Sequence, residues 1–397
     1  MDPTSIETVA RKESRHLLQN YARYPLVVES ASGCYVFDLA GKRYLDMISG
    51  IGVNALGYGH PRIAAALAEQ AARCVHTSNL VYHRYQGALA ERLCAMSGLD
   101  RAFFSNSGGE AMECALKAVR SHGRSLNPRK IRLVALENSF HGRSFGALAV
   151  TGHPQYRRLF EPLHPEVTFV APNDEDGLAR AVDEETAGIV LEPVLGEGGI
   201  YPLEDSFLVR ARELADRHQA LLVVDEAQCG LGRTGRPFAF QWSGIRPDLV
   251  VAAKPLAAGL PLGATLFTEQ AAQSIPVGMH GTTCGGGPLA CRVALEFLAV
   301  MEELLPHIRE VGSVLRAGLE SLAARHPVIA GIRSKGLMFG IQLSVPGHPI
   351  LLRALERGLW LNCTHDTVLR MLPPFILTRE QAEEAIEILD QALADLN

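Results

Sequence analysis

Residues 220–227, ALLVVDEA, and residues 248–254, DLVVAAK, decide the fold class of this chain. Each is a short apolar run followed by a charged side chain, Asp225 in the first case and Lys254 in the second. Short runs of this kind are typical of strands that a parallel sheet buries on both faces. Similar runs on either side of them alternate with helical patterns, which indicates βα units. We therefore predict an α/β fold with a mostly parallel sheet.

The alternation begins near residue 100. The further strands that we expect are RAFFS, IRLVAL, VTFVAP, AGIVLEP and LGATLF, and the helices are GGEAMECALKAVRSHG and FLVRARELADRHQ. Because such strands need apolar cover on both faces, helices should lie on both sides of the sheet. We predict a large domain over residues 51–290.

The pattern then changes to two long amphipathic helices, LACRVALEFLAVMEELLPHI and VGSVLRAGLESLAARH. The short strands GLMFGIQL and TVLRMLPP follow, and TREQAEEAIEILDQALADL forms the last helix. This helix should begin after Thr378, because Thr378 and Gln381 have the spacing of a capping box. We predict a small α+β domain over residues 291–397. Residues 1–50 should pack against it as an antiparallel piece with a turn at Gly41.

Length and composition limit the class of protein. The 397 residues, 47% of them hydrophobic, suffice for two packed domains. The net charge is −5, from 38 Lys and Arg against 43 Asp and Glu, and no long basic run offers a surface for nucleic acid. No stretch resembles a membrane span or a signal peptide. From the charge balance we expect a small-molecule substrate. The eight cysteines contain no C-x-x-C pair, so we expect reduced thiols and a cytoplasmic location.

Asp225 and Lys254 should meet at one edge of the sheet, although 29 residues separate them. Parallel strands deliver their carboxyl ends to the same edge, where ligands bind. A lysine in an apolar site has a lowered amine pKa, as a Schiff-base nucleophile requires, and an aspartate can hold a pyridine nitrogen protonated. Taken alone, Asp225 could cap the next loop and Lys254 could be a surface cation. Their common edge favours a cofactor site.

The stretch SNSGGEA, residues 105–111, predicts a phosphate site at this edge. It follows the strand RAFFS and places Gly108 and Gly109 at the start of a helix, whose free amides attract anions. A plain glycine-rich turn is the alternative.

A second glycine motif, G-x-G-x-x-G at Gly230, Gly232 and Gly235, would suggest a dinucleotide-binding oxidoreductase. Four residues separate the first glycine from the strand ending at Asp225, and the following RPFAFQWSG shows no helical period. These two features indicate an accidental match.

Several longer motifs together resemble one known family. They are GVNALGYGHP, SNSGGEA, SFHGRS, EPVLGEGG, VVDEAQCGLGRTG, AAKPLAAGLPLGA, HGTTCGGGPLA and VLRMLPP, and their order and spacing match. From about residue 20 to its end the chain resembles the class III (ornithine and acetylornithine) aminotransferases of fold type I. The resemblance implies the PLP-dependent transferase fold, with a mostly parallel seven-stranded sheet sandwiched by helices. It also implies pyridoxal 5′-phosphate as the cofactor.

The resemblance implies cofactor roles for particular residues. Lys254 matches the Schiff-base lysine, which also moves the proton between the substrate carbon and the cofactor C4′, and Asp225 matches the pyridinium partner. The other implied cofactor-binding residues are Ser107, Gly108 and Gly109 at the phosphate, Phe140 on the pyridine ring, and Gln228 near the phenolic oxygen. Thr283 matches a threonine that reaches the phosphate from the neighbouring subunit, which implies a homodimer with active sites at the interface. Core filling for Phe140 and a turn role for Thr283 are the alternatives.

The resemblance also implies a substrate site. Arg143 resembles an arginine that binds a substrate carboxylate, with Thr282 as a further substrate-binding residue. Arg370 resembles a second carboxylate-binding arginine, and Glu197 resembles the carboxylate that pairs with it. Because one pocket accepts an ω-amino donor and then a dicarboxylic oxo acid, Glu197 would neutralise Arg370 for the first and release it for the second. The alternative is a surface ion pair worth under about 1 kcal/mol. No metal site is expected.

Some positions depart from the family pattern. Gly109 stands where Thr is usual, Leu195 where Gln is usual, Cys284 where an aromatic residue is usual and Gly287 where Asn is usual. Residues 256–258, Leu-Ala-Ala, replace a Leu-Gly-Gly-type run. These changes touch the phosphate site and the loop after the lysine.

The activity that the resemblance implies is transfer of the δ-amino group of N-acetylornithine to 2-oxoglutarate. The products are N-acetylglutamate 5-semialdehyde and glutamate, as in arginine biosynthesis. Succinylornithine, ornithine, 4-aminobutyrate or a lysine-pathway donor are alternative substrates. A degenerate PLP-fold protein that acts as a binding or regulatory subunit is an alternative of another class.

Overall fold

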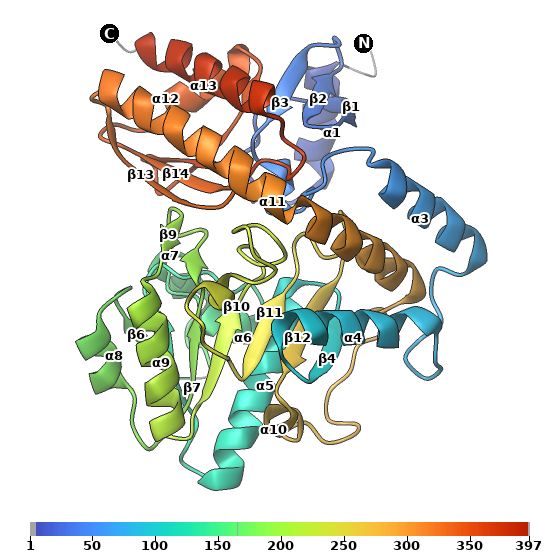
Figure 1. Cartoon of the computed structure of the whole chain (residues 1–397), viewed down its shortest axis with the longest axis vertical. Helices are drawn as coiled ribbons and strands as arrows, with labels where there is room; N and C mark the ends of the chain where they lie inside the picture. The colour runs from blue at the N-terminus through green and yellow to red at the C-terminus, as the bar shows by residue number, and fades with distance from the viewer. Residues whose placement is uncertain (1–4, 165, 396–397) are drawn as a thin grey trace.

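The central sheet of the molecule lies in the lower half of Figure 1, and the computed structural model describes residues 5–164 and 166–395. Within these residues the sheet has seven strands. Their order is β4 (Arg101–Ser105), β12 (Gly263–Phe267), β11 (Leu249–Ala252), β10 (Leu221–Asp225), β7 (Thr186–Leu191), β5 (Arg132–Leu136) and β6 (Val167–Val170). Each strand coincides with one of the apolar runs in the sequence, so the predicted seven-stranded α/β sheet is confirmed.

The strand directions bring Asp225 and Lys254 to the same edge. β10 is parallel to β11 and to β7, and β5 is parallel to β7 and to β6. Asp225 pairs with Val251, three residues before Lys254. Only β12 runs antiparallel to its neighbours β11 and β4, so the sheet is mostly parallel across its described strands.

Both faces of the sheet are buried, because alternate residues of its strands join two different cores. Leu222 and Val224 of β10 pack in a core that includes Phe207 of α9 (Asp205–Arg217). Leu221 and Val223 pack in a second core, with the apolar side chains of α5 (Gly108–Leu126). Strands that are apolar at every position, rather than at every second one, produce this two-sided burial.

The remaining elements of this half are short apart from α4. They are α4 (Arg84–Ser97), α6 (Phe145–Ala149), α7 (Pro154–Arg157), η1 (Arg158–Phe160), α8 (Glu175–Ala181), β8 (Val194–Leu195), β9 (Tyr201–Pro202), η2 (Ala239–Trp242) and α10 (Glu269–Ala272). Gly230, Gly232 and Gly235 lie in turns between β10 and η2 and do not open a long helix. A dinucleotide fingerprint requires such a helix after the strand.

The two long helices expected after residue 288 are one continuous helix, α11 (Pro288–Arg325), so that expectation is wrong. Pro306 lies inside α11 and has no N–H to donate to the preceding turn. The helix continues because packing holds each part. Its first part contacts α3 (Pro61–Arg73) and α4, and its last part contacts α13 (Arg379–Ala394) and β13 (Ile329–Lys335).

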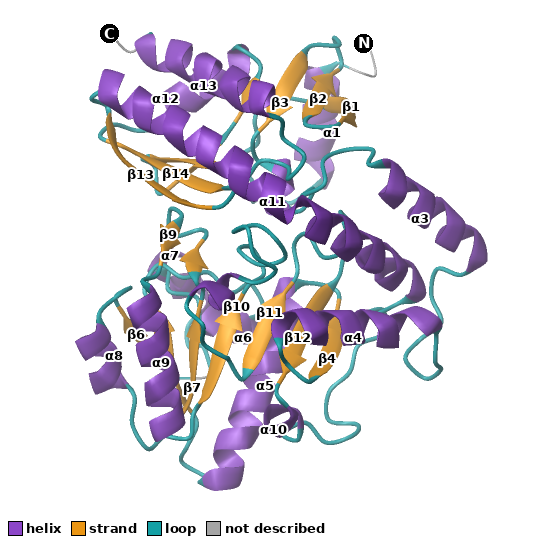
Figure 2. Cartoon of the chain, viewed as in Figure 1, coloured by secondary structure: helices purple, strands orange, loops and turns teal. Residues whose placement is uncertain are grey.

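Two smaller sheets form the upper half of the molecule (Figure 2). The first contains β13, β14 (Met338–Leu343), β17 (Val368–Met371) and β16 (Asn362–Thr364), and the second contains β1 (Val28–Ser32), β2 (Tyr35–Asp38), β3 (Arg43–Asp46) and β15 (Leu359–Trp360). The helices here are α1 (Ile6–His16), α2 (Ser49–Gly52), α12 (His348–Glu356) and α13.

The N-terminal segment pairs with the C-terminal part of the chain. β2 and β3 are antiparallel, and β3 pairs in parallel with β15, far along the chain. Gly41 takes a φ of 79° in the turn between β2 and β3. Thr378 and Gln381 form the predicted capping box of α13. The domain limits at residues 50 and 290 stay predictions.

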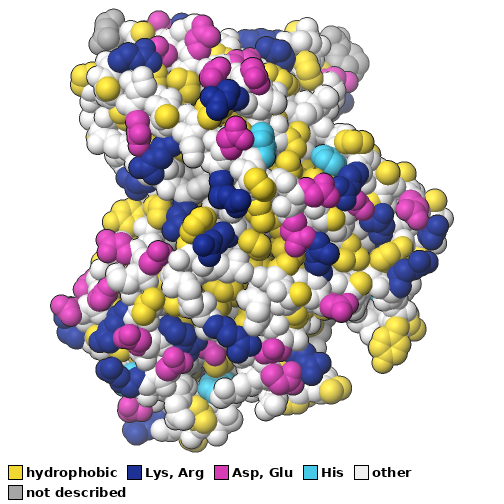
Figure 3. Space-filling view, viewed as in Figure 1, with side chains coloured by type: hydrophobic (Ala, Val, Ile, Leu, Met, Phe, Trp, Pro, Cys, Tyr) yellow, Lys and Arg dark blue, Asp and Glu magenta, His cyan; other side chains and the backbone are white. Residues whose placement is uncertain are grey.

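Surface and helix composition give two further observations. Basic and acidic side chains are intermixed over the face that Figure 3 shows. Among the described residues, no helix combines the length and the apolar character needed to cross a membrane.

Candidate active site

A cavity of about 160 Å³ lies at the carboxyl edge of the central sheet. The predicted site residues that line it are Gly108, Gly109, Phe140, Glu197, Asp225, Gln228 and Lys254. They come from five separate segments of the chain, and the parallel strands β10 and β11 supply Asp225 and the approach to Lys254.

Lys254 lines this cavity just beyond the end of β11, and its backbone N–H donates to the carbonyl of Ala227 at 3.2 Å. Its Nζ forms no ion pair with any described carboxylate. Burial lowers the pKa of the Lys254 ammonium, Glu197 opposes this shift, and Arg370 adds to it. A lowered pKa increases the fraction of neutral amine, which is the nucleophilic form.

Asp225 is buried and accepts two hydrogen bonds. Its Oδ1 accepts from the backbone N–H of Ala227 at 3.0 Å, and its Oδ2 lies 2.8 Å from Nδ1 of His141. Nε2 of His141 is buried without a hydrogen-bond partner in the described part of the chain. Because the carboxylate of Asp225 can only accept, the proton of this pair lies on Nδ1. His141 therefore donates to Asp225 and orients its carboxylate.

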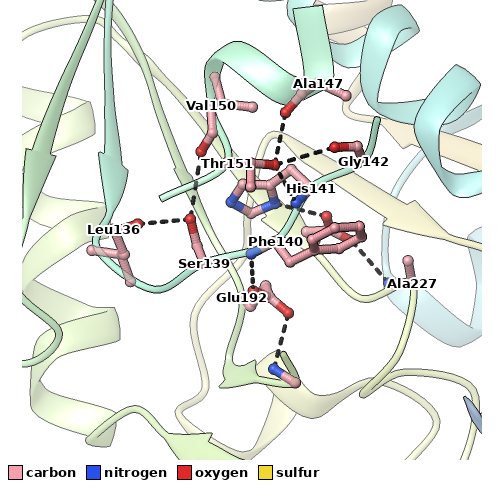
Figure 4. A network of polar contacts seen from close by, with 12 residues as sticks. Leu136, Ser139, Phe140, His141, Gly142, Ala147, Val150, Thr151, Glu192 and Ala227 are labelled. Atoms are coloured by element: carbon pink, nitrogen blue, oxygen red, sulfur yellow. Dashed lines mark hydrogen bonds and ion pairs between the residues drawn. The ribbon is translucent and has the colours of Figure 1, made fainter. Parts of the chain in front are cut away.

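A hydrogen-bond network fixes the loop that carries Phe140 and His141 (Figure 4). The backbone N–H of His141 donates to Oγ1 of Thr151 at 3.0 Å. The backbone N–H of Phe140 donates to Oε1 of Glu192 at 2.8 Å, and Gly196 donates to the other oxygen at 3.2 Å. Glu192 therefore connects the loop of Phe140 with the loop that precedes Glu197.

Glu192 itself is buried and lines the cavity. Burial raises the pKa of the Glu192 carboxyl to about 7; His141 opposes this rise, and the charge of Asp225 adds to it. The sequence motifs SFHGRS and EPVLGEGG contain His141 and Glu192, but the sequence reasoning assigned neither a role. Glu192 directly follows an apolar run, AGIVL, as Asp225 follows the run ALLVV. This shared position in the sequence could have identified Glu192 as a site residue.

The N-terminus of α5 forms one wall of the cavity. Ser107 is its N-cap, and its hydroxyl accepts from the backbone N–H of Glu110 at 3.2 Å. A Cβ at Gly108 would lie 3.3 Å from the Cβ atoms of Ala227 and Ala253, so a side chain there would crowd the cavity wall. The partial positive charge at this helix end favours a bound anion.

Glu197 and Arg370 form an ion pair at the cavity wall. Nη1 of Arg370 lies 2.5 Å from Oε1 of Glu197, and its Nε donates to Oδ1 of Asn362 at 3.0 Å. Arg370 is only 2% exposed. Burial alone would raise the pKa of the Glu197 carboxyl, but the charges of Arg370 and Lys254 outweigh burial and lower it. The alternative that Glu197 and Arg370 form an ion pair on the surface is therefore wrong, because Arg370 is buried.

Five predicted residues do not line the cavity: Ser107 and Arg370, whose positions are given above, and Arg143, Thr282 and Thr283. Arg143 is exposed, and its guanidinium lies over the ring of Tyr156. The hydroxyl of Thr282 accepts a hydrogen bond at 3.1 Å from Nδ2 of Asn106, which lies just before the start of α5. Thr283 is exposed on the loop between α10 and α11.

The cavity fits pyridoxal phosphate. It combines an amine, a buried carboxylate held by two donors, an aromatic side chain and a helix N-terminus. Oε1 of Gln228 is also buried there without a partner among the described residues. Such an acceptor favours a bound group that carries a donor.

The fold and this site define a pyridoxal-phosphate-dependent transferase of the α/β aminotransferase class. Comparison with known families agrees: the family Aminotransferase class-III matches residues 18–393, and the chain belongs to this family. Class-III aminotransferases use pyridoxal 5′-phosphate as their cofactor.

Individual relatives are similar over their full length. The chain is 41% identical to the acetylornithine aminotransferase of Aquifex aeolicus over 379 residues, which cover 95% of this chain and 100% of the relative. It is 42% identical to that of Methanocaldococcus jannaschii, over 97% of both chains. The crystal structure of ornithine aminotransferase from Toxoplasma gondii superimposes with a TM-score of 0.95 at 30% identity, over 99% of this chain and 96% of that one.

Proposed function

We propose that this enzyme transfers the δ-amino group of N-acetylornithine to 2-oxoglutarate, in arginine biosynthesis in the cytoplasm. The observation that carries the proposal is the ion pair of Glu197 and Arg370 beside Lys254. The pocket would be neutral there while the pair is formed and positively charged once Glu197 leaves Arg370. Similarity to acetylornithine aminotransferases over nearly the whole chain supports the choice of donor.

The residues of the cavity divide the work of binding and proton transfer. Bound pyridoxal phosphate supplies an aldehyde that an amine can join and an electron-withdrawing pyridinium ring. The amides at Gly108 and Gly109 would bind its phosphate, and Asp225 would keep the proton on its pyridine nitrogen. Phe140 packs on the ring and excludes water. Lys254 Nζ would hold the aldehyde carbon of the cofactor, and as an amine it would move the proton between the donor carbon and C4′.

The ion pair sets which substrate the pocket accepts. While Arg370 is paired with Glu197, the charge of the carboxylate neutralises that of the guanidinium. The pocket then accepts the uncharged carbon chain next to the ω-amine of the donor. When a dicarboxylic oxo acid enters, Arg370 exchanges Glu197 for the second carboxylate. A guanidinium suits this exchange because it binds carboxylates with two parallel hydrogen bonds. Arg143 binds the carboxylate that both substrates share.

A homodimer is part of the proposal. Leu80, Val81 and Tyr82, in the connection between α3 and α4, are strongly exposed, and apolar side chains protrude at this edge in Figure 3. Exposed apolar residues of this size favour a protein interface. Nδ2 of Asn79 donates to the carbonyl of Thr282 at 3.3 Å, so this connection is tied to the loop of Thr283. An interface here would carry Thr283 to the phosphate site of the other subunit.

A panel of ω-amino donors assayed with 2-oxoglutarate tests the proposal. N-Acetylornithine should give the highest kcat/KM, and succinylornithine, ornithine, 4-aminobutyrate and an amino-carrier-linked lysine precursor should give lower values. A preference for ornithine would favour the second candidate, which the likeness to ornithine aminotransferases supports. A protein that binds the cofactor at Lys254 but transfers no amino group from any donor would refute both.

A further inference from the structure

Arg143 stacks on an aromatic ring and has no ion-pair partner among the described carboxylates. Its Cζ lies 3.8 Å from the ring centroid of Tyr156 and 5.3 Å from that of Phe140. A guanidinium 3.8 Å from a ring centroid presents its face to the ring. Its N–H donors lie in the guanidinium plane, so the stack leaves them free for another partner.

Tyr156 itself lies near two further rings. Its ring contacts Phe140 edge to face, with centroids 6.2 Å apart and an interplanar angle of 89°. The ring centroid of His153 lies 5.2 Å from that of Tyr156, and His153 is only 2% exposed. The ring of His365, in the turn between β16 and β17, lies 5.2 Å from that of His153. Tyr156 therefore belongs to a row of rings that runs from the cavity wall to the hairpin carrying Arg370.

The histidine beside Tyr156 carries no positive charge near neutral pH. Burial and the neighbouring His365 lower the pKa of the His153 imidazolium to about 4. A neutral ring does not repel the guanidinium of Arg143. Arg143 thus lies beside two aromatic rings, and no carboxylate in the described part of the chain forms an ion pair with it.

We propose that Tyr156 is a positioning residue that holds Arg143 ready for a substrate carboxylate. The ring fixes the guanidinium face while the donor edge stays open, so binding a carboxylate does not require the stack to break. Removing the ring lets the long arginine side chain move freely, and ordering it again weakens binding. The inference rests on the proposed role of Arg143 in binding carboxylates.

The opposite effect would follow if the stack were a resting contact that a substrate must disrupt. In that case removal of the ring would leave carboxylate binding unchanged or make it tighter. The sign of the change therefore separates positioning from a resting contact.

The test measures the dissociation constant of glutarate, an unreactive dicarboxylate, for cofactor-loaded protein by titration calorimetry. Tyr156→Leu should raise this constant by about fivefold, the size expected for losing one cation–π contact. Tyr156→Phe keeps the ring and should bind like the unaltered protein. Tyr35→Leu is a matched control, because Arg43 stacks on Tyr35 at 4.5 Å well away from the cavity.

A double-mutant cycle separates this inference from the proposed function. Arg143→Met should weaken glutarate binding, and Tyr156→Leu should add nothing in that background. Full additivity, or unchanged or tighter binding in Tyr156→Leu, would overturn the inference alone. If Arg143→Met leaves glutarate binding unchanged, the proposed role of Arg143 and this inference both fail, while the donor panel still decides the reaction. If the Leu variant does not fold, Tyr156→Met gives the same comparison.

Discussion

At the residue scale, the chemistry of the cavity depends on how each charged side chain is partnered. Asp225 is held by Ala227 and His141, and Arg370 is held by Glu197 and Asn362. Lys254 has no ion-pair partner among the described residues, and burial lowers the pKa of its ammonium. Fixed charges can hold a proton or a carboxylate, while an unpartnered amine remains available for reaction.

Replacing the lysine should separate binding from turnover. Lys254→Ala should lower kcat by about a thousandfold or more, because a positioned proton-transfer group alone contributes 10² to 10⁴. Stopped-flow assays with N-acetylornithine would measure this loss, and the circular dichroism spectrum of the variant should match that of the unaltered protein. Turnover within tenfold of normal would show that another residue carries the proton.

Removing Glu197 should change donor selectivity. In Glu197→Ala the charge of Arg370 is unpaired in both half-reactions. Donors with a second carboxylate should therefore bind better and react with a higher kcat/KM. The ratio of kcat/KM for glutamate over N-acetylornithine should rise roughly tenfold, equivalent to about 1.4 kcal/mol. Steady-state assays of both donors give this ratio. An unchanged ratio would contradict the two-state role of the pair.

At the element scale, buried carboxylates hold the turns that follow the strands. Glu226, directly after β10, accepts from the backbone N–H groups of Ala239 and Phe240, both at 2.7 Å. It thereby anchors the start of η2 against the sheet. Burial raises the pKa of the Glu226 carboxyl to about 8, against the two hydrogen bonds that lower it.

This raised pKa predicts a dependence of stability on pH. In the unfolded chain a glutamate ionises near pH 4.3, so from there up to about 8 the unfolded state releases its proton more readily than the folded state. The contribution of Glu226 to stability is full at low pH and is lost as the pH rises towards 8. Glu226→Gln, which cannot ionise, should remove this term. Denaturant unfolding at pH 5 and pH 8 would show the unaltered protein losing stability relative to the variant, and a constant difference would contradict the prediction.

Helix α11 shows how tertiary contacts override a local signal. The amphipathic patterns of residues 289–308, which include Pro306, and of residues 311–326 indicate two helices. Contacts with α3 and α4 before Pro306, and with α13 and β13 after it, stabilise one helix through the proline. A missing hydrogen bond within the helix costs less than these contacts contribute.

At the scale of the whole molecule, the exposed apolar connection between α3 and α4 predicts self-association. Leu80→Asp combined with Tyr82→Glu should raise the dimer dissociation constant at least about a hundredfold, because two large side chains would lose their burial. Analytical ultracentrifugation measures the constant, and activity should fall with the dimer fraction. Leu159→Asp changes an equally exposed leucine on η1 and should leave the dimer intact. A dimer that survives the double substitution would place the interface elsewhere.

The sequence by itself determined the α/β class, the seven strands and the common edge of Asp225 and Lys254. These features depend on periodicity and strand direction, which are local or follow from parallel pairing. The tertiary structure alone decided that His141 binds Asp225, 84 residues away, that Glu192 joins two loops, and that Arg143 lies on Tyr156. Such contacts depend on how distant segments pack, and no pattern within either segment records its partner.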